Sequence, residues 1–261
     1  MIILLILLPF TLFSEILENQ NIDCLLEHAD PETLVICDID NTLIESTLQM
    51  GSAQWRNHIR RKAKKLGCTE KTAEEILDKF WLFAQYFVPV RSVDPAAPAV
   101  LMQLQEMRIP VIALTAREPI EALHTAKQLE SANFDLIHSH PFEDTFLPLP
   151  HPSIFEKGII YCGDNTKEAA LEAFFQKMGS IPKRVLFIDD RLEQIKSVES
   201  FAKRIGIIFV GIRFGGADAR VKAFNPEVAD YQWSHLPDII SDEEAFIQNS
   251  LKNREFDKEA L

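Results

Sequence analysis

The stretch VICDIDNTLI, residues 35–44, joins an apolar run to two aspartates that lie two positions apart, Asp38 and Asp40. A continuous apolar run of this kind is typical of a strand buried on both faces of a parallel sheet. In an open α/β sheet, side chains at the carboxyl end of a strand face the crevice where ligands bind. Two carboxylates in one crevice repel each other unless a cation lies between them or one of them holds a proton. The stretch therefore predicts a strand with a charged pocket at its end.

Further apolar runs repeat this pattern and decide the fold class. With the run at 34–37, they cover residues 111–114, 185–188 and 207–210, and helix-like segments lie between them. Alternation of apolar strands with helices predicts an α/β fold with a doubly wound parallel sheet. A weaker pattern suggests one more pair of strands, at 136–138 and 158–161.

Helix signals agree with this fold. Pro119 stands at a position that the first turn of a helix tolerates, which predicts a helix from Glu118 to Leu129. Asn165 or Thr166 can cap a second helix that runs to Met178, just before a glycine.

Oxygen donors also follow other predicted strands. Asp189 and Asp190 end the run at 185–188, and Thr115 ends the run at 111–114. Because the carboxyl ends of parallel strands meet at one edge, these two aspartates and the first pair are expected to share a site that suits a hard cation, Mg²⁺ by preference. Lys167, in the first turn of the second helix, would add an ammonium group. Such a set would neutralise the charge of a transferring phosphoryl group.

Alternatives stay open for two of these residues. Thr115 could instead cap the helix that begins near Glu118. Lys157, Lys177 and Lys183 lie near Lys167 in the sequence, which we favour because it stands at a helix start after a strand.

A helical insertion interrupts the predicted core. Residues 46 to 87 contain no strand-type run and place apolar residues at helical spacing. We therefore expect a helical cap at 46–95, a core made of 31–45 and 96–240, and a charged C-terminal tail at 241–261. The cap carries six positive charges within ten residues, from Arg56 to Lys65. Such a run is usually a solvated face, although it could steer an anionic substrate toward the acidic pocket.

The order of these residues resembles the four sequence motifs of the haloacid dehalogenase (HAD) superfamily, over roughly residues 31–213. The insertion resembles that superfamily's C1-type helical cap. The run Thr-Ala-Arg at 115–117, together with the apolar start of the chain, is most similar to an uncharacterised bacterial branch of the superfamily. The matching motifs are Asp38-x-Asp40-x-Thr42, Thr115, Lys167 and Asp189-Asp190.

The resemblance implies a role for each matching residue. Asp38 would be the nucleophile that forms an aspartyl-phosphate, and Asp40 the general acid and base. Thr115 and Lys167 would bind phosphoryl oxygens. The Mg²⁺ ligands would be Asp38, the Asp40 backbone carbonyl and Asp189, with Asp190 in support. The expected function is Mg²⁺-dependent hydrolysis of a small phosphorylated substrate.

Three other functions are alternatives to this one. A phosphotransferase of the same fold would pass the phosphoryl group to an alcohol, and a catalytically weak or inactive relative would act as a binding or effector protein. A receiver-type signalling switch also uses Asp, Thr, Lys and a metal. It places its acidic pair first, whereas here the pair at 189–190 comes last.

The charge balance argues against broad binding to nucleic acids. The 261 residues contain 27 Lys and Arg against 39 Asp and Glu, a net charge of −12. Phosphate backbones are bound by Lys- and Arg-rich surfaces that release counterions. The four cysteines lack the spacing of a zinc site, and their sequence does not decide whether any pair forms a disulfide.

The chain begins with an apolar run at residues 2–13. A transmembrane helix needs about 20 residues, whereas the apolar part of a signal peptide needs roughly 7 to 15. We therefore expect a signal peptide at 1–14, export to the periplasm or the medium, and no stable transmembrane span. The alternatives are an uncleaved anchor or a buried N-terminal strand or helix in a cytoplasmic protein.

Overall fold

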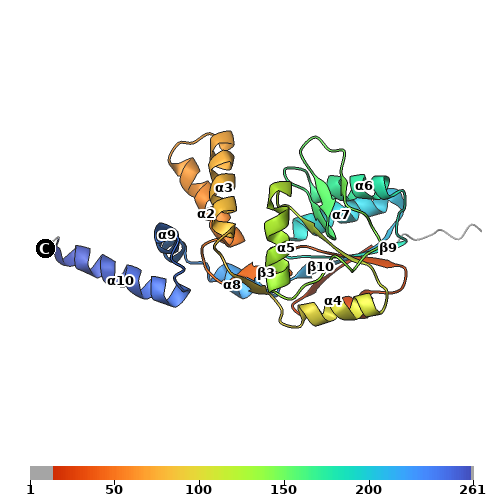
Figure 1. Cartoon of the computed structure of the whole chain (residues 1–261), viewed down its shortest axis with the longest axis horizontal. Helices are drawn as coiled ribbons and strands as arrows, with labels where there is room; N and C mark the ends of the chain where they lie inside the picture. Colours follow the sequence, from red (N-terminus) through yellow and green to blue (C-terminus); the bar gives the residue numbers. More distant parts are fainter. Residues whose placement is uncertain (1–13, 260–261) are drawn as a thin grey trace, which may run out of the picture.

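The central element is an eight-stranded sheet in which six neighbouring strands run parallel (Figure 1). The computed structural model describes residues 14–259. The strand order is β1-β10-β9-β2-β5-β8-β7-β6, and the last two strands are antiparallel to their neighbours. This confirms the predicted α/β class. The strands are β1 (Ser14–Asn19), β2 (Thr33–Cys37), β5 (Val111–Thr115), β6 (Thr145–Phe146), β7 (Ile154–Glu156), β8 (Ile159–Tyr161), β9 (Arg184–Asp189) and β10 (Ile208–Phe214).

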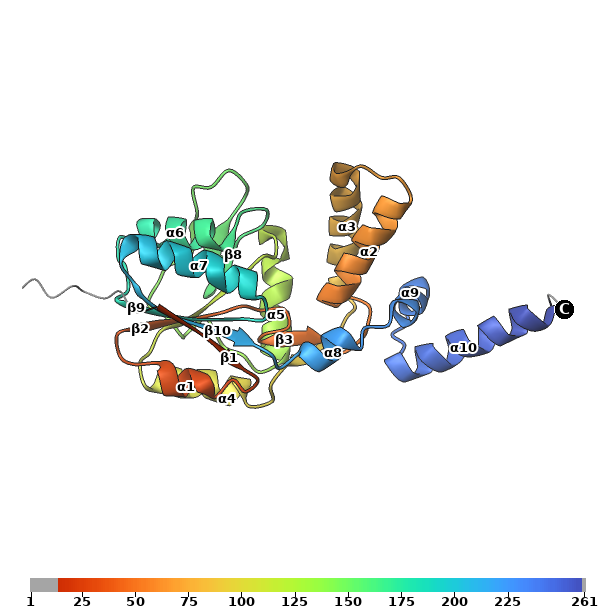
Figure 2. The ribbon, with the colours of Figure 1, turned by 180° about the vertical axis from the view of Figure 1, so that it is seen from behind.

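Helices cover both faces of the sheet, as Figures 1 and 2 show. Alternate residues of β2 face opposite sides because side chains alternate along a strand. Val35 and Cys37 pack in one apolar cluster with α1, α4 and α5, while Leu34 and Ile36 pack in a second cluster with α6 and α7. These helices are α1 (Cys24–His28), α4 (Ala97–Glu106), the 3-10 turn η1 (Pro119–Glu121) leading into α5 (Ala122–Ser131), α6 (Lys167–Met178) and α7 (Leu192–Ile205).

The insertion is a helical cap on a short two-stranded stem. The stem pairs β3 (Ile44–Ser46) with β4 (Val90–Ser92) in antiparallel fashion, so the inserted segment leaves and re-enters the core at one point. Between them lie α2 (Ala53–Lys65) and α3 (Glu70–Gln85). The side chains of Ser52 and Thr69 cap these two helices by accepting backbone N–H groups of the first turn.

The C-terminal segment completes the cap. Ala229 of α9 (Pro226–Ser234) is buried among α2 and α3 side chains, and the Gln232 side chain accepts the Met50 N–H at 2.9 Å. The expected boundary, which placed all of 96–240 in the core, is therefore wrong for α9. We call the apolar core of this unit the cap cluster; it consists of Leu48, Met50, Trp55, Ile59, Leu77, Trp81, Ala84, Val88 and Ala229.

Two more helices lie near the end of the chain. A short helix, α8 (Asp218–Lys222), links β10 to α9. The charged tail forms a helix, α10 (Asp242–Glu259), that projects away from the rest of the molecule in both ribbon views.

Two elements differ from the sequence-based expectations. Residues 136–138 form a turn, because the Asp135 carboxylate accepts the backbone N–H groups of Ile137 and His138 at 3.0 and 3.3 Å. Strand β8, which was expected to pair with residues 136–138, pairs with β7. Strand β1 was not expected; four of the six residues in its sequence, SEILEN, are polar, and it forms the parallel edge of the sheet beside β10.

The predicted signal peptide lies almost wholly outside the described residues, since only Ser14 belongs to β1. Within residues 14–259, no helix is both long and apolar enough to cross a bilayer. All four cysteines are free thiols.

Candidate functional site

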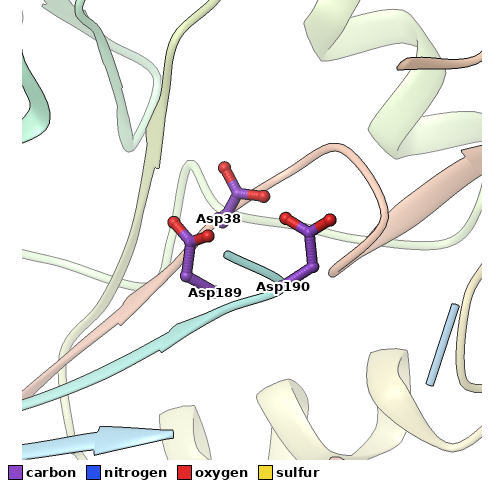
Figure 3. A group of neighbouring side chains, drawn as sticks. All are labelled: Asp38, Asp189 and Asp190. Atoms are coloured by element: carbon purple, nitrogen blue, oxygen red, sulfur yellow. The ribbon is translucent and has the colours of Figure 1, made fainter. Parts of the chain in front are cut away.

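Asp38 and Asp189 lie side by side at the carboxyl ends of two adjacent parallel strands (Figure 3). Asp38 directly follows β2, and its backbone N–H donates to the Ile188 carbonyl of β9 at 2.9 Å. Asp189 is the last residue of β9 and is fully buried, while Asp38 is 6% exposed. The apolar strands thus force two carboxylates into the interior, where an unpaired charge is costly.

Lys167 offsets part of this buried charge. Its Nζ contacts the carboxylates of both Asp38 and Asp189, the latter at 2.6 Å. Lys167 is the first residue of α6, which is capped by the Thr166 hydroxyl. Burial alone would lower the pKa of Lys167, but the two carboxylates raise it, so the ammonium form is retained. Of the other lysines considered, Lys183 pairs with exposed Glu32 instead.

Asp190 completes a cluster of three carboxylates. One oxygen each from Asp38, Asp189 and Asp190 lies within 4.8 Å of the others. Burial, reinforced by Asp189, raises the pKa of Asp190 to about 7. Burial also raises the pKa of Asp38, and the other two carboxylates add to the shift. When all three carboxylates are ionised, they and the one ammonium group leave two negative charges uncompensated, which fits a divalent cation held by oxygen ligands.

Thr42 ties the two strand ends together. Its hydroxyl donates to Asp38 Oδ2 at 3.2 Å and accepts the Asp190 backbone N–H at 3.1 Å. Asn41, in the left-handed backbone region, donates its side-chain amide to Asp190 Oδ2 at 3.3 Å. The loop after β2 therefore positions both acidic pairs.

Thr115 lies at the same edge, at the end of β5, and lines the cavity above the aspartates. Its hydroxyl accepts the Arg117 backbone N–H at 3.2 Å. The alternative that Thr115 caps the next helix is not realised, because Glu118 and Glu121 cap that turn reciprocally.

Asp40 points into the same cavity but stands apart from the cluster of three. The Arg117 guanidinium holds it through two hydrogen bonds, Nε to Oδ2 at 2.9 Å and Nη2 to Oδ1 at 2.7 Å. Arg117 Nη1 donates to Thr125 and Gln128, so this buried guanidinium is bonded on all its nitrogens. Burial alone would lower the pKa of Arg117, but the Asp40 carboxylate raises it.

The part that Arg117 plays in the site was not predicted from the sequence. The available signal was an arginine two residues past the end of a buried strand, a position where a buried guanidinium needs a carboxylate partner.

The cap forms the opposite wall of a cavity of about 410 Å³. Arg56 and Arg60 of α2 line it, together with Lys79 and Trp81 of α3. The remaining charges of the basic run match the expected solvated face: Arg61 and Lys65 are exposed, and Lys62 and Lys64 pair with Asp230 and Glu70.

Relatives of this chain carry names that refer to the outer membrane. A protein of Chlamydia pneumoniae named "Putative outer membrane protein" is 26% identical over 242 residues, which cover 87% of each chain. A protein of Chlamydia trachomatis serovar D with the same name is 25% identical over 219 residues, covering 83% of this chain and 82% of the relative.

Two solved structures are distantly similar, each with 13% identity and a TM-score of 0.41. One is titled "Hydrolase, haloacid dehalogenase-like family protein SP0104 from Streptococcus pneumoniae". The similarity covers 69% of this chain and 93% of that protein's chain. The other is a "putative beta-phosphoglucomutase from Thermotoga maritima". The similarity covers 73% of this chain and 99% of that protein's chain.

A family model matches nearly the whole described chain, from residue 15 to residue 246. The family is described as "Protein of unknown function (DUF2608)". The aspartate cluster, the strands beneath it and the cap that faces it all fall within the match. The chain therefore belongs to the DUF2608 family.

Proposed function

We propose that the protein is a Mg²⁺-dependent phosphomonoester hydrolase that carries the phosphoryl group on Asp38. The observation that supports this most directly is the Lys167 ammonium group between Asp38 and Asp189, beside Asp190 and at the floor of a cavity. These residues also occur in the order of the four HAD motifs, the resemblance on which the roles below are based.

The first half of the reaction would transfer the phosphoryl group to the protein. An Asp38 oxygen attacks phosphorus in line with the ester bond and that bond breaks. Asp40, which must have taken up a proton from solvent before this step, gives that proton to the leaving oxygen. Lys167 and Thr115 bind the non-bridging phosphoryl oxygens, whose charge they stabilise.

The second half would return Asp38 to its starting state. Asp40, now a carboxylate, takes a proton from water, the water oxygen attacks phosphorus, and the bond to Asp38 breaks to release inorganic phosphate. Each Asp40 oxygen keeps a second lone pair beyond its bond to Arg117. Arg117 can therefore fix the orientation of Asp40 without blocking proton transfer.

The donor set fits Mg²⁺, a hard cation that prefers oxygen ligands. Asp38, Asp189 and the Asp40 backbone carbonyl would hold it, with Asp190 in support. When bound, the ion would neutralise the two uncompensated negative charges of the cluster and the charge of the phosphoryl oxygens.

Replacement of the nucleophile tests the proposal. In Asp38→Asn, Mg²⁺-dependent hydrolysis of an aryl phosphate should fall by at least about a thousandfold, because the amide is a poor nucleophile. Asp23→Asn is the matched control, since Asp23 is exposed, distant from the cavity and caps no backbone group. Undiminished turnover in Asp38→Asn would refute the assignment of Asp38.

We also propose that the protein is exported and that its apolar N-terminal segment is a signal peptide that is cleaved off. The run at 2–13 has the length of a signal-peptide core, and the relatives are named as outer membrane proteins. Mass spectrometry of the N-terminus of protein recovered from the cell envelope should find a chain that begins near residue 15. An intact Met1 in all the recovered protein would contradict cleavage.

A further inference from the structure

The core wall of the cavity has more acidic than basic side chains, and the cap wall has more basic than acidic ones. The core wall carries the aspartate cluster, while the cap wall presents the cations Arg56, Arg60 and Lys79. If the phosphoryl group binds at the cluster, the rest of the substrate extends toward the cap. The cations there are therefore placed to meet its far end.

Arg56 is the cap guanidinium that keeps donors available. Each nitrogen of Arg60 already has a partner, because Nε and Nη2 donate to Glu74 at 2.6 and 2.9 Å and Nη1 donates to Asn57 at 3.1 Å. Arg56 uses only Nη2, which donates to Asp78 at 2.9 Å. Its Nε is buried without a hydrogen-bond partner among the described residues. Among the described residues Nη1 also makes no hydrogen bond, so Nη1 and the second hydrogen of Nη2 remain available to an anion in the cavity that Arg56 lines.

Trp81 holds Arg56 in this position. The Arg56 guanidinium lies over the Trp81 ring, 5.7 Å from its centroid, and the Trp81 N–H donates to Glu121 Oε2 of the core at 2.9 Å. The cap cation is therefore fixed relative to the core by an aromatic side chain that contacts both. A guanidinium presented in this way is suited to a planar or multidentate anion.

We infer that Arg56 binds a second anionic group of the substrate, a carboxylate or a second phosphate. The inference deepens the proposed function and rests on it: the substrate class is a small phosphate ester with an anion at its far end. The cavity volume of about 410 Å³ fits a small organic molecule.

A matched series of three-carbon substrates tests this. Propyl phosphate has a neutral end, 3-(phosphonooxy)propanoate ends in a carboxylate, and propane-1,3-diol bisphosphate ends in a second phosphate. In the wild-type protein we expect kcat/KM for one or both anionic substrates to exceed that for propyl phosphate by about 10- to 100-fold, the range for hydrogen bonds to charged groups. Which of the two is preferred identifies the anion.

The preference should depend on Arg56. In Arg56→Gln, kcat/KM for the anionic substrates should exceed that for propyl phosphate by no more than about threefold. Arg56→Lys should give an intermediate ratio, because lysine keeps the positive charge but lacks the planar pair of guanidinium donors. Arg61→Gln is the matched control on the same helix; Arg61 is exposed, does not line the cavity, and should keep the wild-type ratio. A wild-type ratio near one, or an unchanged ratio in Arg56→Gln, would overturn the inference while leaving hydrolysis established.

Binding separates this inference from the proposed function. If no substrate is hydrolysed, the proposed hydrolase function fails, and calorimetry with propane-1,3-diol bisphosphate and propyl phosphate decides the role of Arg56. Tighter binding of the bisphosphate that is lost in Arg56→Gln supports an anion site. Equal binding of the two compounds overturns it.

Discussion

The buried Arg117 guanidinium forms an ion pair with the partly exposed Asp40, and all three of its nitrogens make hydrogen bonds. One edge binds the Asp40 carboxylate, and Nη1 binds Thr125 and Gln128. Burial of a charge is tolerated when every polar group finds a partner, and loss of one partner leaves the others unpaired. The orientation of Asp40 therefore depends on four hydrogen bonds from a single side chain.

Arg117→Lys should destabilise the protein even though it keeps the charge. Lysine cannot form the two parallel bonds to Asp40 and reach Gln128 at the same time. We expect the free energy of unfolding to fall by about 1–3 kcal/mol in urea titrations. Arg61→Lys, at an exposed site, should change it by less than about 0.5 kcal/mol. Equal stabilities of the two variants would contradict the ion-pair argument.

Binding of Mg²⁺ should stabilise the folded chain, because the ion would relieve repulsion in the carboxylate cluster. At about 100 times the dissociation constant the gain is roughly 2.7 kcal/mol, visible as a rise in Tm that EDTA reverses. Asp189→Asn should lose this response and Asp23→Asn should keep it. A response to Mg²⁺ that Asp189→Asn retains would place the ion elsewhere.

Residue order and strand ends were enough to predict much of the candidate site. Asp38, Asp189, Asp190, Thr115 and Lys167 do meet at one edge of the sheet. Their positions follow from apolar runs that end at polar residues, which a sequence displays directly. The partner of Asp40 could not be read in this way, because the contact with Arg117 depends on how the β5 loop turns back across the pocket.

At the scale of elements, the cap is attached to the core by buried polar contacts. Trp81 donates to Glu121, and Gln85 bridges the Gln128 side chain and the Gly51 carbonyl at 2.9 and 3.0 Å. Such contacts are directional, so they fix the cap in orientation as well as position.

Trp81→Phe tests this attachment. The variant keeps an aromatic ring but leaves the buried Glu121 oxygen without its donor, which should cost about 1–3 kcal/mol of stability in urea titrations. Trp233→Phe is the matched control, because the Trp233 indole N–H makes no hydrogen bond within the described residues while its ring packs in the same cap. A larger loss in Trp233→Phe would show that packing outweighs the hydrogen bond.

A second element-scale prediction concerns the loop before β6. His140 packs against Phe142 and Phe155, and its Nδ1 accepts the Phe142 N–H at 3.0 Å. Burial lowers the pKa of His140. The unfolded chain therefore takes up a proton below about pH 6.5 that the folded chain resists, so stability is lost as the pH falls below that value.

His140→Asn keeps an acceptor but cannot titrate. Its free energy of unfolding should fall less than that of the wild type between about pH 7 and about pH 5, as measured in urea at the two pH values. An identical fall in both proteins would exclude His140 as a source of the pH dependence.

Helices and strands were predictable from the sequence where a single short segment contains every residue that determines the element. The four apolar runs became β2, β5, β9 and β10, and α6 lies where its cap and glycine stop place it. Strand β1 was missed because an edge strand needs only one apolar face, and α9 was misplaced because its partners lie more than 130 residues earlier in the chain.

At the scale of the whole molecule, the C-terminal segment should be essential up to the start of α10 and dispensable beyond it. Ala245 is fully buried, and Asp242 accepts hydrogen bonds from Gln49 and Gln232. A chain that ends at residue 248 should therefore keep the Tm of the full protein.

A chain that ends at residue 223 removes α9 and exposes the cap cluster. Loss of this buried apolar surface should lower the Tm by several degrees or more, with the cap unfolding before the core in thermal scans followed by tryptophan fluorescence. An unchanged Tm in the chain ending at 223 would show that α2 and α3 form a stable cap without α9.

The pairing of β1 with β10, together with the packing of α9 on the cap, determines when the newly made chain can complete its fold. The ribosome makes β1 and the two cap helices first, yet each is completed only by residues that emerge after position 207. Until then the edge of the sheet and the cap cluster are both exposed, and the cavity lacks a stable second wall. A nascent or prematurely terminated chain is therefore expected to stay incompletely folded, and the proposed activity would appear only once synthesis is nearly complete.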